Sequence, residues 1–225
     1  WGNGNGGTVG AVSSINSLVG SSVDERLGVY PAHALPNGHY FVRNPNWDNG
    51  AALNAGAVTW GNGNGGTVGS ITVGNSLVGT SSDDGVGTRL PLILNNGNYV
   101  VASPYWDNPL TANTNAGAAT WCNGSTGSSG SISFINSLIG GSVDDGVGDY
   151  LIALTNGNYV VCSPGWNSLS PTVSDVGAVT WGNGRTGIRG VVSRANSLVG
   201  ASFGDQVGVG CTALTNGNYV VISTL

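Results

Sequence analysis

Three tryptophan segments combine an aromatic ring with carboxylate and amide groups, which is the chemistry that a sugar ligand needs. They are Trp47-Asp48-Asn49, Trp106-Asp107-Asn108 and Trp166-Asn167. An indole face stacks on the C–H face of a sugar ring, while Asp and Asn hydrogen-bond its hydroxyls. One segment per repeat would give several weak sites whose binding adds up. A tryptophan that recurs at a fixed position also packs between repeats, so packing is the alternative for all three.

Two pairs of adjacent carboxylates are the candidate metal ligands. They are Asp83 with Asp84 and Asp144 with Asp145. Ca²⁺ prefers oxygen ligands, and nearby serine hydroxyls and backbone carbonyls would supply more of them. The turns lack the spaced Asp-X-Asp-X-Asp array of a specific calcium loop, and an aspartate in a tight turn usually caps its own backbone. We therefore expect no cofactor, with Ca²⁺ as the one ion that these turns would suit.

Groups for catalysis are scarce in this chain. The only histidines, His33 and His39, flank one turn, and two surface side chains on strands are favoured over an acid–base pair with Asp48 or Glu25. Glycine strings such as Gly61-Asn62-Gly63 have no helix after them, so they do not indicate phosphate loops. We assign no catalytic residue and expect a protein that is not an enzyme.

The composition restricts the classes of partner. The 225 residues carry six Lys and Arg against eleven Asp and Glu, a net charge of −5. An acidic chain is not attracted to nucleic acid or to an anionic membrane surface. No apolar run reaches the ~18 residues of a membrane span. We expect neither nucleic-acid binding nor membrane insertion. The three cysteines occupy three different positions of the repeat, as small sheet residues do, and indicate no disulfide framework.

Four motifs recur in fixed order with a period of about 60 residues. Asn-Gly between two apolar runs predicts a β-hairpin with a type I′ turn, which needs positive φ at both central residues. An acidic turn precedes each hairpin, and a Pro-X-Trp segment follows the first three. Trp-X-Asn-Gly begins at Trp1, Trp60, Trp121 and Trp181, Asn-Ser-Leu begins at Asn16, Asn75, Asn136 and Asn196, and the Asn-Gly turns are at Asn37, Asn96, Asn156 and Asn216.

Each period predicts four short strands, typified by residues 211–214, 219–222, 56–60 and 69–78, because β-branched residues alternate with Gly, Asn and Asp. No stretch carries a helical period. Four antiparallel strands per repeat match a β-propeller blade, and stacked blades bury the faces that one sheet cannot bury alone.

The predicted fold is therefore an all-β propeller of four four-stranded blades in a single repeat domain, residues 1–225. The chain begins at the third strand of a repeat and ends after the second strand, so pairing of the two terminal segments would close the ring. A larger or oligomeric propeller and a β-solenoid are the alternatives. The blades are approximately 28–80, 85–140, 145–200, and 205–225 plus 1–20.

The motifs Asn-Gly-Asn-Tyr-Val-Val, Ser-Pro-X-Trp-Asp-Asn, Ala-Gly-Ala-Val-Thr-Trp-Gly-Asn-Gly and Asn-Ser-Leu-Val-Gly resemble tandem repeats of large secreted or surface-exposed bacterial proteins of the adhesin type. In layout they are similar to kelch-type propeller repeats. The resemblance covers essentially the whole chain. It implies an extracellular or cell-surface repeat module without enzymatic activity, and it carries over no catalytic residue.

Three functions follow as expectations. The first is a structural or adhesive module that displays a protein- or glycan-contacting surface. The second is a lectin-like carbohydrate binder with one weak site per blade. The third is a subunit that self-assembles into a filament or shell. The expected partners are accordingly a surface glycan, a protein, or other copies of the same chain.

Overall fold

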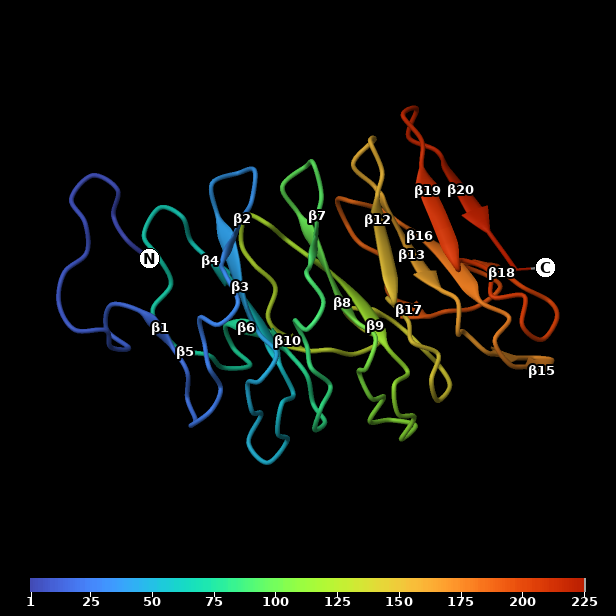
Figure 1. Cartoon of the computed structure of the whole chain (residues 1–225), viewed down its shortest axis with the longest axis horizontal. Coiled ribbons are helices and arrows are strands. Elements are labelled where there is room, and N and C mark those ends of the chain that lie inside the picture. Colours follow the sequence, from blue (N-terminus) through green and yellow to red (C-terminus); the bar gives the residue numbers. More distant parts are fainter. Residues whose placement is uncertain (225) are drawn as a thin grey trace.

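The computed structural model describes residues 1–224, and none of them is helical. The sheets follow one another along the long axis of the molecule, and the N- and C-termini lie at opposite ends (Figure 1). The fold is thus an all-β linear array, as far as residues 1–224 show it. These residues contain no helix with the length and hydropathy that a membrane crossing needs.

Three repeats each form an antiparallel sheet of four strands in chain order, so the predicted strand number is confirmed. The predicted ranges 28–80, 85–140 and 145–200 each contain one of these sheets. The first is β2 (His33–Ala34), β3 (Tyr40–Asn44), β4 (Ala57–Gly61) and β6 (Ser76–Val78). The second is β7 (Leu92–Ile93), β8 (Tyr99–Ser103), β9 (Ala118–Cys122) and β11 (Leu138–Ile139). The third is β12 (Tyr150–Ala153), β13 (Tyr159–Ser163), β16 (Ala178–Gly182) and β18 (Leu198–Val199).

Short parallel strands join each sheet to the repeat before it. They are β5 (Gly69–Ser70), β10 (Gly130–Ser131) and β17 (Gly190–Val191), which pair with β1 (Leu18–Val19), β6 and β11 respectively. The strand predicted over 69–78 is therefore two strands, β5 and β6, which belong to different sheets. Asn75 makes the turn between them, because its Oδ1 accepts from the Thr72 amide at 2.8 Å and its Nδ2 donates to the Ser70 carbonyl at 2.9 Å.

The ends of the array hold incomplete sheets. β1 and β5 form a two-stranded sheet at the N-terminal end, and β19 (Gly210–Ala213) and β20 (Tyr219–Ile222) form another at the C-terminal end. The predicted ring closure by residues 205–225 and 1–20 is therefore wrong for this chain. Each parallel strand ties its sheet to the preceding one along a single direction, so the terminal segments are carried apart. A further short hairpin, β14 (Ser168–Leu169) with β15 (Thr172–Val173), lies in the loop between β13 and β16.

The predicted type I′ turn is also wrong. The Gly97 amide donates to the Leu94 carbonyl at 3.0 Å, and the Leu94 amide donates to the Asn98 carbonyl at 2.8 Å. Among residues 94–98, only Gly97 has a positive φ, which is 87°. The loop is thus a three-residue type I turn followed by a left-handed glycine, because Asn95 takes the first central position. Asn96 stabilises it by accepting a bond from the Asn98 amide through Oδ1 at 3.1 Å.

The core lies between successive sheets. Tyr99 and Val101 on one face of β8 pack in a cluster with Phe41 of the preceding sheet, whose ring centroid lies 5.1 Å from that of Tyr99. Val100 on the opposite face packs with Tyr159 of the following sheet. The alternation of strand side chains therefore gives both faces of each inner sheet a neighbour, which removes apolar area from water on both sides.

Candidate functional site

The three tryptophans predicted to bind sugar lie in the core. Trp47, Trp106 and Trp166 are exposed by only 5%, 1% and 5%. The Nε1 of Trp47 donates to the Ser21 hydroxyl at 3.2 Å. A sugar cannot stack on an indole whose faces are already covered by protein. The prediction that these tryptophans stack on a sugar is therefore wrong. They pack in the core, which was the alternative.

The polar residues beside these tryptophans brace their own loops. In each repeat, the side-chain oxygen after Trp accepts a backbone N–H from further along the same loop. The pairs are Asp48 with the Asn54 amide at 2.9 Å, Asp107 with Asn115 at 2.8 Å, and Asn167 with Asp175 at 3.0 Å. Asn49 donates to the Gly79 carbonyl at 2.9 Å, and Asn108 is buried, with Oδ1 accepting from the Leu110 amide at 3.1 Å.

The second aspartate of each predicted metal pair is a buried acceptor. Asp84 accepts the Thr80 and Ser81 amides on Oδ2 at 2.7 and 2.9 Å. Its Oδ1 accepts the Asp107 amide at 2.8 Å, so it joins its own turn to the following repeat. Asp145 repeats the arrangement with the amides of Gly141, Ser142 and Asn167. These carboxylates hold backbone donors in place, as caps of tight turns do.

Burial and hydrogen bonding act in opposite directions on these acids. Burial raises the pKa of Asp84 and of Asp145 above the ordinary value, although the backbone N–H donors lower it in part. Asp205, the equivalent acid at the exposed C-terminal end, accepts the Ser202 and Ala201 amides, and these bonds lower its pKa. The direction of the pKa shift in this motif therefore depends on whether a following repeat buries the carboxylate.

The first aspartate of each pair is exposed and has a left-handed backbone. Asp83 and Asp144 have φ of 65° and 59°. Asn54 donates to Asp83 at 3.0 Å, and Asn115 donates to Asp144 at 2.9 Å. Each pair thus places its two carboxylates against different protein donors. Within residues 1–224, no group of three or more His, Cys, Asp or Glu side chains is arranged to hold a metal ion.

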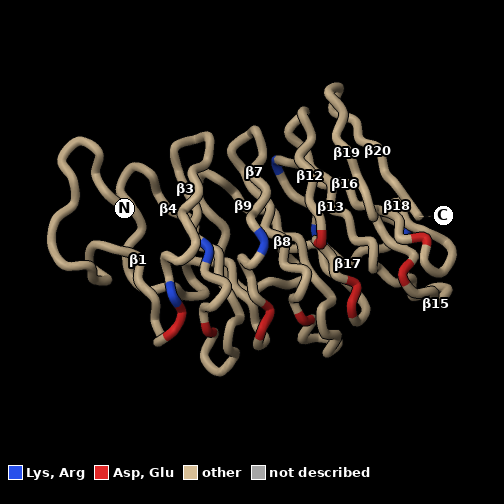
Figure 2. The backbone as a smooth tube through the Cα atoms, in the orientation of Figure 1, with Lys and Arg blue, Asp and Glu red and all other residues tan. Residues whose placement is uncertain are grey.

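The acidic turns line one long edge of the array. Figure 2 shows most of the Asp and Glu positions along the lower edge, below the sheets. The hairpin turns form the opposite edge, at the top of Figure 1. The two edges therefore present different chemistry, one carrying most of the carboxylates and the other the asparagine amides of the Asn-Gly turns.

The two histidines serve the sheet of the first complete repeat. His33 stacks on Phe41 with ring centroids 5.3 Å apart, and burial, helped by the charge of Arg43, lowers its pKa. His39 accepts the Gly63 amide on Nδ1 at 3.2 Å and lies against the Trp60 ring. These contacts explain both side chains by packing and hydrogen bonding within the fold.

The three cysteines are free thiols in strands. Cys122 and Cys162 are buried in β9 and β13, and Cys211 is partly buried in β19. Burial raises the pKa of the Cys122 thiol to about 12. A thiol with so high a pKa is protonated at neutral pH and is a poor nucleophile.

The tryptophans of the Trp-X-Asn-Gly motif join neighbouring repeats. From the sequence they were recognised only as markers of the repeat period. The Nε1 of Trp60 donates to the Gly124 carbonyl at 2.9 Å, one repeat further along. Trp1 and Trp121 make the same bond to Gly63 and Gly184 at 3.1 and 3.0 Å. The signal was in the sequence, because the glycine three positions after each Trp recurs as faithfully as the Trp itself.

A second glycine makes room for the indole. A Cβ atom on Gly127 would lie 2.8 Å from the Cβ of Trp60, and the φ of Gly127 is +77°. Beside it, β10 pairs with β6, so that the Ile132 amide donates to the Val78 carbonyl at 3.1 Å. Ile132 and Leu77 are both buried there. We name this arrangement the inter-repeat contact: Trp60 and Leu77 on one side, and Gly124, Gly127 and Ile132 on the other.

The fold and the inter-repeat contact define the class of protein as an all-β tandem-repeat array. The chain belongs to the family described as a repeat of unknown function, DUF5650, which matches residues 1–29, 34–88, 93–149 and 153–209. No curated protein matches the chain. Each of the three longer matches begins at the last residue of the first strand of one sheet and runs through its other three strands and the acidic turn after them. The predicted tandem repeats are therefore confirmed.

Proposed function

We propose that the chain is a non-enzymatic structural repeat module of the extracellular space or cell surface, whose array holds a protein- or glycan-contacting surface at regular spacing. The observation that carries the proposal is the inter-repeat contact. It recurs three times with the same partner types, and its three indole bonds differ by only 0.2 Å. A contact repeated so closely sets a fixed spacing between repeats.

The physical basis is that such arrays are stabilised by nearest-neighbour contacts. Each inner sheet is joined to the next by a parallel strand, an indole hydrogen bond and a buried apolar layer. Pulling the ends apart would have to break all three together. This favours a role in which the chain bears load or keeps surfaces apart.

The outward surface is suited to display. The hairpin turns and the acidic turns repeat along opposite edges, so that any group that contacts one repeat meets an equivalent group on the next. The resemblance to surface-exposed bacterial proteins supports the proposed location. The lectin alternative loses its stacking surface with the burial of Trp47, Trp106 and Trp166, so a glycan would have to bind elsewhere on these edges.

Single-molecule pulling on the two ends tests the structural role. We expect stepwise unfolding in which each step releases about one repeat, and a lower force for Trp121→Ala, which removes one inter-repeat indole. Extension without resistance would overturn the proposal. The location is tested separately, by antibodies against the chain: labelling of intact producing cells supports it, and labelling only after permeabilisation contradicts it.

A larger ring, or a ring completed by several chains, stays a prediction. Repeats joined in a head-to-tail manner close into a ring if the rotation between them allows it and otherwise form an open filament. Electron microscopy of assembled chains distinguishes the two.

A further inference from the structure

The N-terminal end of the array presents an empty half of the inter-repeat contact. Gly7 has a φ of +72°, close to the +77°, +77° and +73° of Gly66, Gly127 and Gly187. An indole covers each of those three glycines, whereas no atom lies within 4 Å of where a Cβ on Gly7 would be. Val12 is 79% exposed, whereas its equivalents are at most 3% exposed; they are Ile71, Ile132 and Val192.

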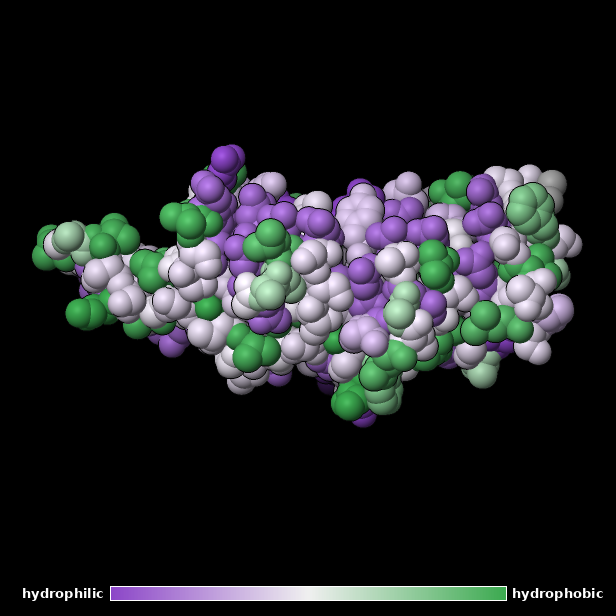
Figure 3. All heavy atoms as spheres, turned by 90° about the horizontal axis from the view of Figure 1, so that it is seen from below, coloured by the Kyte–Doolittle hydropathy of each residue, from purple (hydrophilic) through white to green (hydrophobic). Residues whose placement is uncertain are grey.

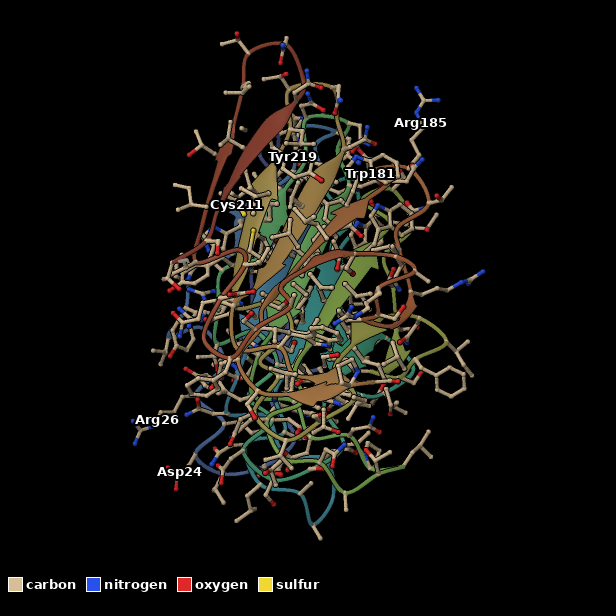
Figure 4. The ribbon with its side chains drawn as sticks, turned by 90° about the vertical axis from the view of Figure 1, so that its right-hand side faces the viewer. Asp24, Arg26, Trp181, Arg185, Cys211 and Tyr219 are labelled. Atoms are coloured by element: carbon tan, nitrogen blue, oxygen red, sulfur yellow. The ribbon has the colours of Figure 1, made fainter. Side chains whose placement is uncertain are left out.

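The C-terminal end presents the other half. Trp181 is 43% exposed, and its Nε1 has no hydrogen-bond partner within residues 1–224. Leu198 of β18 is 59% exposed, whereas the equivalent Leu77 and Leu138 are 1% and 0% exposed. Figure 4 looks onto this end and shows Trp181 and Tyr219 in its upper half. The edge of β18 that would receive a parallel strand is therefore open.

The two ends also hold complementary halves of one sheet. At the N-terminal end, a groove of about 720 Å³ lies between residues 1–30 and the outer face of β3, with Leu18, Tyr40 and Val42 in its wall. It occupies the place where an inner repeat has the hairpin of the preceding sheet. At the C-terminal end, the β19–β20 hairpin exposes Val220 and Ile222, although its other face is packed. Figure 3 shows apolar side chains at both ends of the molecule.

We infer that the C-terminal end of one copy binds the N-terminal end of a second copy, in continuation of the inter-repeat contact. The register of the inner contacts fixes the pairs: Trp181 covers Gly7 and donates to the Gly4 carbonyl of the second copy. β18 pairs in parallel with its residues 10–11, as β11 pairs with β17. Val12 of the second copy is buried beside Leu198, and the β19–β20 hairpin enters the groove in front of β3.

The two halves cannot meet within one chain, because they lie at opposite ends of the array (Figure 1). A head-to-tail contact of this kind uses two different surfaces and propagates along a line or around a ring. The contact forms between separate chains, so we expect the association to depend on the protein concentration.

This inference deepens the proposed structural role, since both use the inter-repeat contact. Sedimentation velocity over a concentration series tests it on the full chain. The unaltered protein is expected to exceed the 22.5 kDa of one chain as its concentration rises. Val12→Asp and Leu198→Asp each place a carboxylate in an apolar contact, which weakens association by roughly a hundredfold or more. Both side chains are exposed in the single chain, so circular dichroism and the melting temperature should not change.

Mixing the two variants is the sharpest test. Each variant alone is expected to stay monomeric, because the substitution disrupts the contact surface at one of its two ends. Together they should form a one-to-one dimer that does not grow further. In that dimer the intact C-terminal end of Val12→Asp binds the intact N-terminal end of Leu198→Asp. Leu110→Asp, on an exposed loop of an inner repeat, is the matched control and should assemble like the unaltered chain.

An unaltered chain that stays monomeric at every concentration would overturn the inference, as would dimers formed by either variant alone. A monomer that still resists pulling would overturn the assembly and leave the proposed structural role standing. An assembling chain that does not resist pulling would contradict the structural role alone.

Discussion

The indole Nε1 of Trp60 lies 2.9 Å from the carbonyl oxygen of Gly124 and donates a hydrogen bond to it across the boundary between two repeats. The same tryptophan begins the strand-and-turn motif of its own repeat. One residue type thus marks the period in the sequence and joins the repeats in space. The strength of the inter-repeat contact can be measured, because the chain contains tryptophans that make this hydrogen bond and one, Trp181, that does not make it within residues 1–224.

Replacement of Trp121 by Phe should lower the free energy of unfolding by about 1 kcal/mol, because the aromatic ring stays while the hydrogen bond to the Gly184 carbonyl is lost. The midpoint of urea denaturation measures the change. Trp181→Phe is the matched control at low protein concentration, since that indole donates to no group within residues 1–224. Equal losses for the two variants would contradict the role of the bond.

Replacement of Gly127 by Ala should destabilise the fold more than replacement of Gly7 by Ala. Both glycines have a positive φ, so both changes carry a left-handed backbone cost of roughly 1–2 kcal/mol. Only Gly127 is covered by the Trp60 side chain, so only there must the added methyl group displace an indole. Thermal melting of dilute protein compares the two. A larger loss for Gly7→Ala would argue against the packing role of the second glycine.

Replacement of Asp84 by Asn should destabilise the fold by about 1–3 kcal/mol, because an amide N–H₂ would face a backbone donor that the carboxylate now accepts. Asp83→Asn changes the neighbouring exposed acid and should stay within about 0.5 kcal/mol. Denaturation with and without added Ca²⁺ also tests the metal prediction. Stabilisation by Ca²⁺ that disappears in both variants would support a metal site at this pair.

The three capping aspartates should titrate in a fixed order. NMR titration of the carboxyl carbons is expected to give Asp205 a pKa below the ordinary 3.8, and Asp84 and Asp145 values above it. Because the folded chain holds the protons of Asp84 and Asp145 more tightly than the unfolded chain, their contribution to stability is full below 3.8. It is lost as the pH rises through their folded pKa.

Asp205 acts with the opposite sign. Its contribution to the stability of the fold is present above pH 3.8 and is lost as the pH falls through its lowered folded pKa. A reversed order of titration would show that burial does not dominate at Asp84 and Asp145.

Replacement of Trp106 by Ala should cost about 3–5 kcal/mol, because the buried indole leaves a cavity. Its exposed neighbour Tyr105 should tolerate Ala within about 0.5 kcal/mol. Circular dichroism and a glycan array on both variants separate packing from binding. A folded Trp106→Ala chain that loses glycan binding would restore the sugar-binding role.

The sequence by itself determined the local structure of this protein. The apolar runs on either side of Asn96 and Gly97 place a hairpin, and the repeats of Tyr-Val-Val place the strand after it. These features depend on backbone conformations and hydrogen bonds within a few residues. Even here the type of turn depended on Asn95, which shifts the loop from two residues to three.

Only the tertiary structure decided how the repeats are arranged. A ring and a line use the same four-stranded sheets and differ in how one sheet meets the next. That geometry is set by residues of neighbouring repeats, such as Trp60 against Gly127, and not by pattern within one repeat. Burial is decided in the same way. From their sequence neighbours, Trp106 and Asp84 are predicted to bind ligands. In the structure the preceding repeat covers Trp106 and the following repeat covers Asp84, so both side chains stabilise the fold.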